Sequence, residues 1–140
     1  MYHRQYSEIY SWSNLLQINT FKDKTCLFIG FSLSDPNSRR LLDIAMKQRG
    51  NSDKYHFLIR KRIDKNDVEK RLSILLQGDI PVHDEKEQQG LKFDEIVEQL
   101  IKVYEKFLEN DALSLGIYTI WIDNYNENSK ILQDILADNA

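Results

Sequence analysis

Glycine and cysteine are scarce in this chain of 140 residues, and each shortage excludes a kind of site. The five glycines lie far apart in the sequence. No two of them can form the glycine-rich first turn that brings backbone to a pyrophosphate in Rossmann-type sites. The single cysteine, Cys26, cannot form an internal disulfide. It stands inside an apolar run, where a small buried side chain is its expected role.

Long apolar runs and a strong charge of one sign are missing as well. No run approaches the roughly 20 residues that span a bilayer, and the first ten residues lack the apolar core of a signal peptide. We therefore expect a cytoplasmic protein without membrane contact. The net charge of −3 argues against nucleic acid as a partner, which needs a concentrated positive surface. With 41% hydrophobic and 29% charged residues, we expect a single globular domain over residues 1–140.

The most informative stretch is a predicted strand, turn and helix over residues 25–37. The apolar run 26–29 is typical of a strand buried on both faces, as in a parallel sheet. Gly30 ends the run, and Asp35 before Pro36 predicts a helix N-cap with proline at the first helical position. Ligands of α/β proteins bind at such turns, and a helix N-terminus suits a phosphate. Many capped turns of this kind bind nothing, so both interpretations stay open.

The rest of the chain alternates between helical and strand patterns, which predicts an α/β fold. A helix between the first two strands makes them parallel, with a right-handed crossover. We expect a partial Rossmann-like layer sandwich of three mainly parallel strands flanked by helices, with the strand at 26–29 in the centre. The predicted strands are 26–29, 55–59 and 117–122; the predicted helices are about 7–18, 36–48, 64–77, 93–109 and 127–137; turns or loops are predicted at 20–24, 79–91 and 123–126.

The residue sequence of the stretch around 28–42 points to a family. Residues 28–37 read Phe-Ile-Gly-Phe-Ser-Leu-Ser-Asp-Pro-Asn and are followed by Arg-Arg-Leu-Leu at 39–42. This stretch resembles the second half of the sirtuin-like domains of bacterial and phage-defence proteins, which are related to the NAD-dependent sirtuins. The resemblance covers about residues 2–62 and 111–137, with 93–109 as a helical insertion. It implies that the chain is the carboxyl-terminal half of a sirtuin-like domain.

The resemblance also implies a cofactor, NAD or an ADP-ribose-type ligand. In the family, the Gly-x-Ser turn lies against the phosphate and ribose of NAD. Gly30, Phe31 and Ser32 would therefore line the cofactor site. Asp35 and Asn37 would support that turn at the start of the helix.

Further candidate contacts follow the other two strands. The last strand and turn of the family lie near the adenine end of NAD, which adds Asp123, Asn124 and Tyr125 as cofactor contacts. A plain turn explains these three residues equally well, because Asn and Asp are common in turns. The basic run at 60–62 falls on the same rim as Ser32, and a solvated charge run is the alternative interpretation.

None of the three histidines suggests a catalytic or metal site. Cleavage of the nicotinamide–ribose bond needs a general base and a group that positions the acceptor. In the resembled family those residues lie upstream of where this chain begins, and His3, His56 and His83 do not match them. His56 is expected to be a satisfied core or edge histidine, and His83, Asp84 and Glu85 are too close in sequence to converge on one ion.

Two functions from different classes remain. The first is part of a sirtuin-like NAD-binding domain, resembling NAD-cleaving anti-phage proteins with glycohydrolase or deacylase-type chemistry, and inactive alone. The second is a non-catalytic α/β interaction or oligomerisation module that uses the helix at 93–109 as an interface. A small sheet with an apolar central strand invites association at its edge. We therefore expect a homo-oligomer or a missing amino-terminal half.

Overall fold

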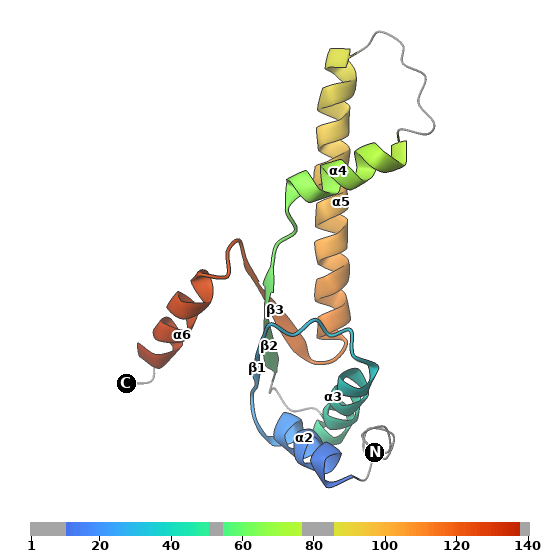
Figure 1. Ribbon diagram of the computed structural model, residues 1–140. Helices are drawn as coiled ribbons and strands as arrows, with labels where there is room; N and C mark the ends of the chain where they lie inside the picture. The colour runs from blue at the N-terminus through green and yellow to red at the C-terminus, as the bar shows by residue number, and fades with distance from the viewer. Residues whose placement is uncertain (1–10, 51–54, 77–85, 138–140) are drawn as a thin grey trace.

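The computed structural model describes residues 11–50, 55–76 and 86–137 and contains a three-stranded parallel sheet with flanking helices (Figure 1). The strand order is β1-β2-β3, and both neighbouring pairs are parallel. This arrangement confirms the predicted α/β fold class. The elements are α2 (Trp12–Asp23), β1 (Leu27–Ile29), α3 (Pro36–Arg49), β2 (His56–Lys61), α4 (Lys65–Leu76), α5 (Lys86–Leu113), β3 (Ile117–Ile122) and α6 (Glu127–Ala137).

Most predicted bounds hold to within a residue or two, but two regions differ. The first helix begins after Ser11, whose hydroxyl accepts a hydrogen bond from the backbone N–H of Asn14, and it runs on to Asp23. The turn predicted at 20–24 is therefore wrong, because Phe21 packs into the core and keeps the chain helical. The predicted start at residues 7–10 lies outside the described residues.

The second difference is the length of α5. Residues 86–91 were predicted as loop but belong to this helix, which is 28 residues long. Gly90 lies inside it, because an isolated glycine in a helix costs only about 1 kcal/mol relative to alanine and is tolerated. Residues 93–109, predicted as a helical insertion, thus lie within a longer helix that projects from the sheet (Figure 1).

The hydrophobic core lies on one face of the sheet. Phe28, Leu58 and Ile117 point to this face, as the strand register requires. Helix α3 and the end of α5 cover it, and Phe21 of α2 and Phe31 also pack there. The buried cluster consists of Leu33, Leu42, Leu58, Ala112, Leu115 and Ile117. A smaller cluster between α2 and α3 consists of Ile18, Leu41 and Ala45.

The opposite face of the sheet is only partly covered. Ile29, Phe57 and Tyr118 are 46%, 37% and 44% exposed. Strand β1 lies at the edge of the sheet and, within the described residues, pairs only with β2. The expectation of a central strand buried on both faces is therefore wrong. An apolar run implies burial on both faces only where helices cover both sides, and α6 buries none of its described residues.

His56 at the start of β2 is a satisfied core histidine, as predicted. The backbone N–H of Cys26 donates to its Nδ1 at 3.1 Å, and Nη2 of Arg49 lies 2.7 Å from its Nε2. The rings of Phe21 and Phe28 meet the imidazole edge-on. Burial and the charge of Arg49 lower the pKa of His56 to about 4. Among the residues that the structure describes, no three metal-ligating side chains cluster.

Protonation of His56 should destabilise the fold. Its pKa is about 4 when folded and about 6.5 when unfolded, so the stabilisation is complete above pH 6.5 and is lost as the pH falls toward 4. Between about pH 7 and about pH 5 the free energy of unfolding should fall by about 2 kcal/mol from this group. Urea denaturation at the two pH values measures the fall. The His56→Gln variant should lack this part of the pH dependence. If the free energy of unfolding of the variant and of the unmodified chain depended equally on pH, His56 would not be its source.

Candidate functional site

The turns that follow the three strands share the carboxyl edge of the sheet, because all three strands run parallel. A pocket of about 350 Å³ opens at this edge. It takes Gly30, Phe31 and Ser32 from the turn after β1, Arg60 from β2 and Tyr125 from the turn after β3. Residues far apart in sequence therefore line one pocket at the edge where α/β proteins bind ligands.

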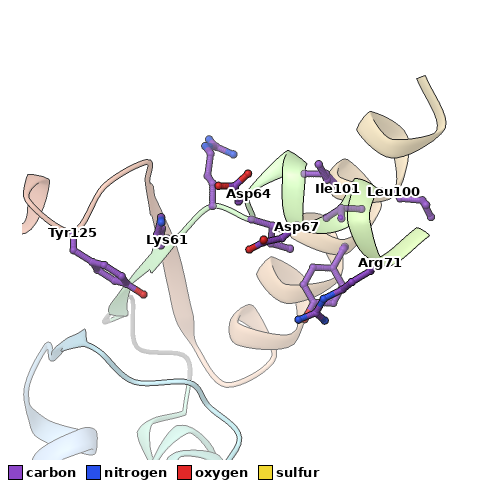
Figure 2. A pocket seen from close by; sticks show the side chains of 11 residues that line it. Lys61, Asp64, Asp67, Arg71, Leu100, Ile101 and Tyr125 are labelled. Atoms are coloured by element: carbon purple, nitrogen blue, oxygen red, sulfur yellow. The ribbon is translucent and has the colours of Figure 1, made fainter. Parts of the chain in front are cut away.

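A second pocket of about 660 Å³ adjoins the first and extends between α4 and α5 (Figure 2). Lys61, Tyr104 and Tyr125 line both pockets, so the two pockets are neighbours, and together they are here called the rim cleft. In the larger pocket, Figure 2 shows Asp67 and Arg71 on α4 beside Leu100 and Ile101 on α5. The rim cleft thus combines cationic, carboxylate and aromatic side chains.

Four of the eight predicted cofactor contacts line the rim cleft: Gly30, Phe31, Ser32 and Tyr125. The Ser32 side chain is exposed, and its hydroxyl lies 2.6 Å from that of Ser34. Gly30 has a positive φ of 68°, a conformation that favours glycine. Apart from its two chain neighbours, no described residue has a heavy atom within 4 Å of the position that a Cβ would take at Gly30, so the backbone there is open to a ligand.

Asp35 and Asn37 act at the start of α3 and do not line the rim cleft. The Asp35 carboxylate accepts hydrogen bonds from the backbone N–H groups of Asn37 and Ser38, at 3.3 and 2.9 Å. A hydrogen bond from the Ser38 hydroxyl and, after it, these two backbone bonds lower the pKa of Asp35. The predicted cap is confirmed, but a carboxylate already occupies the helix N-terminus that suits a phosphate. Asn37 Oδ1 accepts a bond from Arg40 within α3, so a supporting role of Asn37 for the turn stays a prediction.

Asp123 and Asn124 belong to the turn between β3 and α6. Their backbone N–H groups both donate to Oε1 of Glu127, at 3.0 and 2.6 Å. This geometry fits the plain-turn alternative for these two residues. Tyr125 differs, because its ring lies against the rim cleft with the Nζ of Lys61 5.8 Å from the ring centroid (Figure 2).

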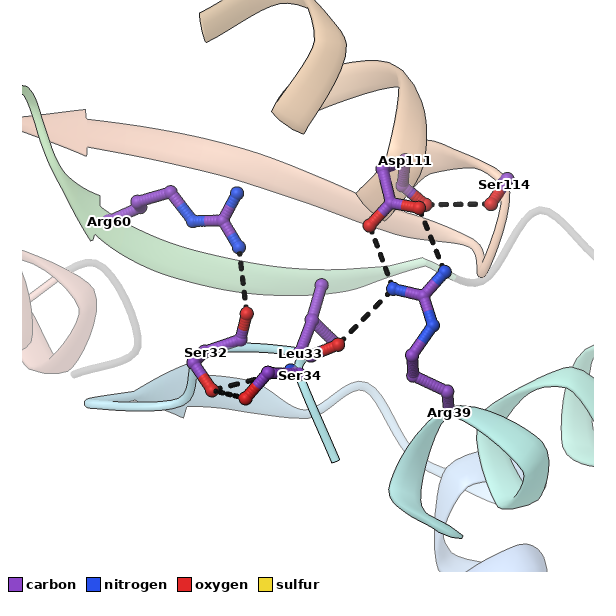
Figure 3. A network of polar contacts seen from close by, with 7 residues as sticks. All are labelled: Ser32, Leu33, Ser34, Arg39, Arg60, Asp111 and Ser114. Atoms are coloured by element: carbon purple, nitrogen blue, oxygen red, sulfur yellow. Dashed lines mark hydrogen bonds and ion pairs between the residues drawn. The ribbon is translucent and has the colours of Figure 1, made fainter. Parts of the chain in front are cut away.

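Arg60 lines the smaller pocket, although the sequence pattern did not single it out as a candidate contact. Its Nη2 donates to the carbonyl oxygen of Ser32 at 3.3 Å (Figure 3), and its Nη1 is buried without a hydrogen-bond partner in the described part of the chain. Burial lowers the pKa of Arg60 from its usual value. In the smaller pocket the positive charge of Arg60 suits an anion such as a phosphate. In the sequence, Arg60 looked like one charge of an ordinary basic run.

A bidentate ion pair holds the turn that carries Ser32. The two Nη atoms of Arg39 donate to the carboxylate of Asp111 at 2.7 and 2.8 Å, and Nη1 also donates to the carbonyl oxygen of Leu33 at 3.2 Å (Figure 3). Leu33 is buried and has a positive φ of 57°, which is uncommon for a leucine. The pair therefore fixes the turn between β1 and α3 to the end of α5, which walls the rim cleft. No local sequence signal joins residues 72 positions apart.

Comparison with known families settles the relationship. The sequence model of the SIR2-like domain family matches residues 1–83. The chain belongs to the SIR2-like domain family. No curated protein matches the chain closely enough to add a named relative.

The SIR2-like match confirms the predicted sirtuin-like resemblance. It spans β1, the turn with Gly30 and Ser32, α3, and β2 with Arg60. Tyr125 lies beyond it, so the resemblance stated for residues 111–137 stays a prediction. Within the described part of this SIR2-like chain, no helix is both long and apolar enough to cross a membrane.

Replacing Arg39 by lysine tests the ion pair in this SIR2-like chain. Lysine keeps the charge but loses the two parallel hydrogen bonds. Because both side chains are about one-third exposed, we expect Arg39→Lys to lower the free energy of unfolding by only about 1 kcal/mol. Urea denaturation measures the change. Lys47→Gln is the matched control, since it breaks a single exposed pair with Asp43, and an equal loss in both variants would contradict a special role for Arg39.

Proposed function

We propose that the rim cleft binds NAD or an ADP-ribose-type ligand, as part of a sirtuin-like NAD-binding domain. Membership in the SIR2-like family supports this assignment. The observation that carries it is the position of Arg60, whose guanidinium lines the smaller pocket beside the Gly-Phe-Ser turn. A dinucleotide offers the pyrophosphate that such a group favours.

The remaining lining residues suit the other parts of a dinucleotide. The open backbone at Gly30 allows close approach of a phosphate or ribose. Ser32 supplies an exposed hydroxyl for hydrogen bonds to ribose. Tyr104 and Tyr125, shared by both pockets, offer aromatic surface for a base. In this proposal the ligand runs from the smaller pocket into the larger one.

The wider role that we propose is membership of an NAD-cleaving anti-phage system of bacterial, cytoplasmic type, as the resemblance implies. This chain would contribute binding rather than cleavage. The described residues place no histidine in the rim cleft, because His56 lies in the core with both ring nitrogens in contact with protein groups. Sirtuin-type chemistry needs a general base at the reacting sugar.

A second candidate function, the interaction or oligomerisation module, is favoured by one observation. Helix α5 exposes several large apolar side chains, among them Val103 at 68% and Phe107 at 64%. Soluble helices ordinarily bury such a stripe. The two functions are compatible, because a domain that binds NAD can also associate through α5.

Calorimetric titration with ADP-ribose, and separately with NAD, tests binding. Arg60→Gln should weaken binding about tenfold or more, because it removes a charge-assisted bond, and Ser32→Ala should weaken it by a few-fold. Lys47→Gln removes an exposed cation of α3 that does not line the rim cleft, and it should leave the affinity unchanged. Absence of binding at millimolar ligand, or full affinity in Arg60→Gln, would overturn the proposal.

An NAD-consumption assay tests the proposal that this chain binds NAD but does not cleave it. Chromatographic detection of nicotinamide release should show no turnover above the buffer control when NAD is incubated with this chain. The physical reason is that the rim cleft, in its described residues, holds no histidine to act as the base. Measurable turnover would show that another residue of this chain supplies that group.

A further inference from the structure

Strand β3 forms the longer of the two edges of the sheet. Within the described residues, β3 pairs only with β2, and it has six residues, whereas β1 at the other edge has three. Strand β3 reads Ile-Tyr-Thr-Ile-Trp-Ile and contains no charged residue, proline or glycine. Natural proteins usually protect a sheet edge with charges, proline or a bulge, so an edge without them suits pairing with another strand.

The hydrogen bonds between β2 and β3 show which backbone groups of β3 point outward. The carbonyl oxygen of Ile122 accepts a bond from the backbone N–H of Arg62 at 2.9 Å. Since successive residues of a parallel strand bond to alternate sides, the even-numbered residues of β3 bond to β2 and the odd-numbered ones face away. The outward groups belong to Ile117, Thr119 and Trp121, and their backbone atoms have no hydrogen bond within the described part of the chain.

We propose that β3 pairs with β3 of a second copy of this chain, antiparallel and centred on Thr119. In this register the outward groups of Thr119 bond to those of Thr119 in the other copy, and those of Ile117 bond to those of Trp121. The pair forms about six backbone hydrogen bonds. A two-fold axis through Thr119, perpendicular to the sheet, makes the edge complementary to itself, as a closed dimer requires.

The packed faces of the two sheets agree with the antiparallel direction. Helices α3 and α5 pack on one face of the sheet, where Leu42 and Ala112 contact Leu58 and Ile117. Rotation about an axis perpendicular to the sheet keeps these faces on the same side and reverses the strand direction. The two sheets therefore join into one continuous sheet with both sets of helices on one face.

The side chains that meet in this register are of favourable kinds. On the packed face, Thr119 lies opposite Thr119, and Ile117 lies opposite Trp121. On the open face, Tyr118 lies opposite Ile120. Thr–Thr pairs and pairs of an aromatic with a β-branched side chain stabilise antiparallel strands, and no like charges face each other here. This self-complementarity favours a second copy of β3 over a strand of unrelated sequence.

The proposed contact is small and separate from the rim cleft. No residue of the 117–121 segment lines either pocket, so the dimer does not depend on the proposed NAD binding. One strand from each copy is less than the roughly 20–30 residues that each partner contributes to a stable complex. We therefore expect a reversible dimer with a micromolar dissociation constant.

Sedimentation velocity over a range of concentrations tests the dimer with the full chain. Thr119→Pro removes an outward N–H at the centre of the contact but no bond to β2, since proline is tolerated where the N–H of an edge strand faces away. It should raise the dissociation constant about tenfold or more. Thr119→Val is the matched control, because it keeps that N–H and the β-branched shape, and it should change the constant by less than about threefold.

Circular dichroism checks that both variants keep their secondary structure. A monomer of the unmodified chain at every concentration, or equal dissociation constants for Thr119→Pro and Thr119→Val, overturns the proposal.

Hydrogen exchange of the unmodified chain tests the same contact and needs no variant. Raising the protein concentration through the dissociation constant should slow exchange of the Thr119 and Trp121 amides about tenfold or more. The Tyr118 amide, which bonds to β2, should exchange equally slowly throughout. A dimer that instead protects the outward amides of Leu27 and Ile29 would be paired through β1 and would overturn the proposal, as would exchange that does not depend on concentration.

Cross-linking tests the register. Residues 118 and 120 of opposite copies form a pair without backbone hydrogen bonds, with Cα atoms about 4.5 Å apart, which a disulfide can bridge. In a Cys26→Ala background, Tyr118→Cys chains mixed with Ile120→Cys chains should form the mixed disulfide faster than either forms its own. Faster self-linking of either variant would contradict the register centred on Thr119.

Discussion

The ion pair between Arg39 and Asp111 is the contact on which the arrangement of the cleft depends. It joins the first turn of α3 to the last turn of α5, and through Leu33 it also holds the backbone after β1. The other contacts of the Gly-Phe-Ser turn in the described part of the chain are the bond from Arg60 on β2 and apolar packing. Two parallel hydrogen bonds between a guanidinium and a carboxylate fix the relative orientation of the two groups as well as the distance between them. The turn therefore keeps its shape although Leu33 adopts a positive φ.

The apolar surface of this SIR2-like chain is divided unevenly. One face of the sheet is packed by α2, α3 and the end of α5, while the other leaves Ile29, Phe57 and Tyr118 partly exposed. Parallel sheets are usually covered on both faces, so this side differs from the common pattern. The outer side of α5 is exposed in the same manner. Association is the physical response that such surfaces favour.

The histidine and the arginine on β2 show how position on a strand decides a role. His56 begins the strand and points into the core, where burial and Arg49 keep it neutral. Arg60 lies four residues later at the carboxyl edge, where its guanidinium reaches the Ser32 carbonyl. Both side chains lie on one face of the strand. The first is structural because it lies in the core, whereas the second lines the pocket at the rim.

The sequence by itself determined the elements and the family. Apolar runs, the Asp-Pro cap before α3 and the Gly-Phe-Ser turn are local signals, and they predicted the strands, the start of α3 and the sirtuin-like relationship. Only the tertiary structure decided that β1 is an edge strand, that Arg60 reaches Ser32 and that Arg39 pairs with Asp111. Those outcomes depend on which distant segments meet. Local propensity and periodicity carry no information on contacts between residues far apart in the chain.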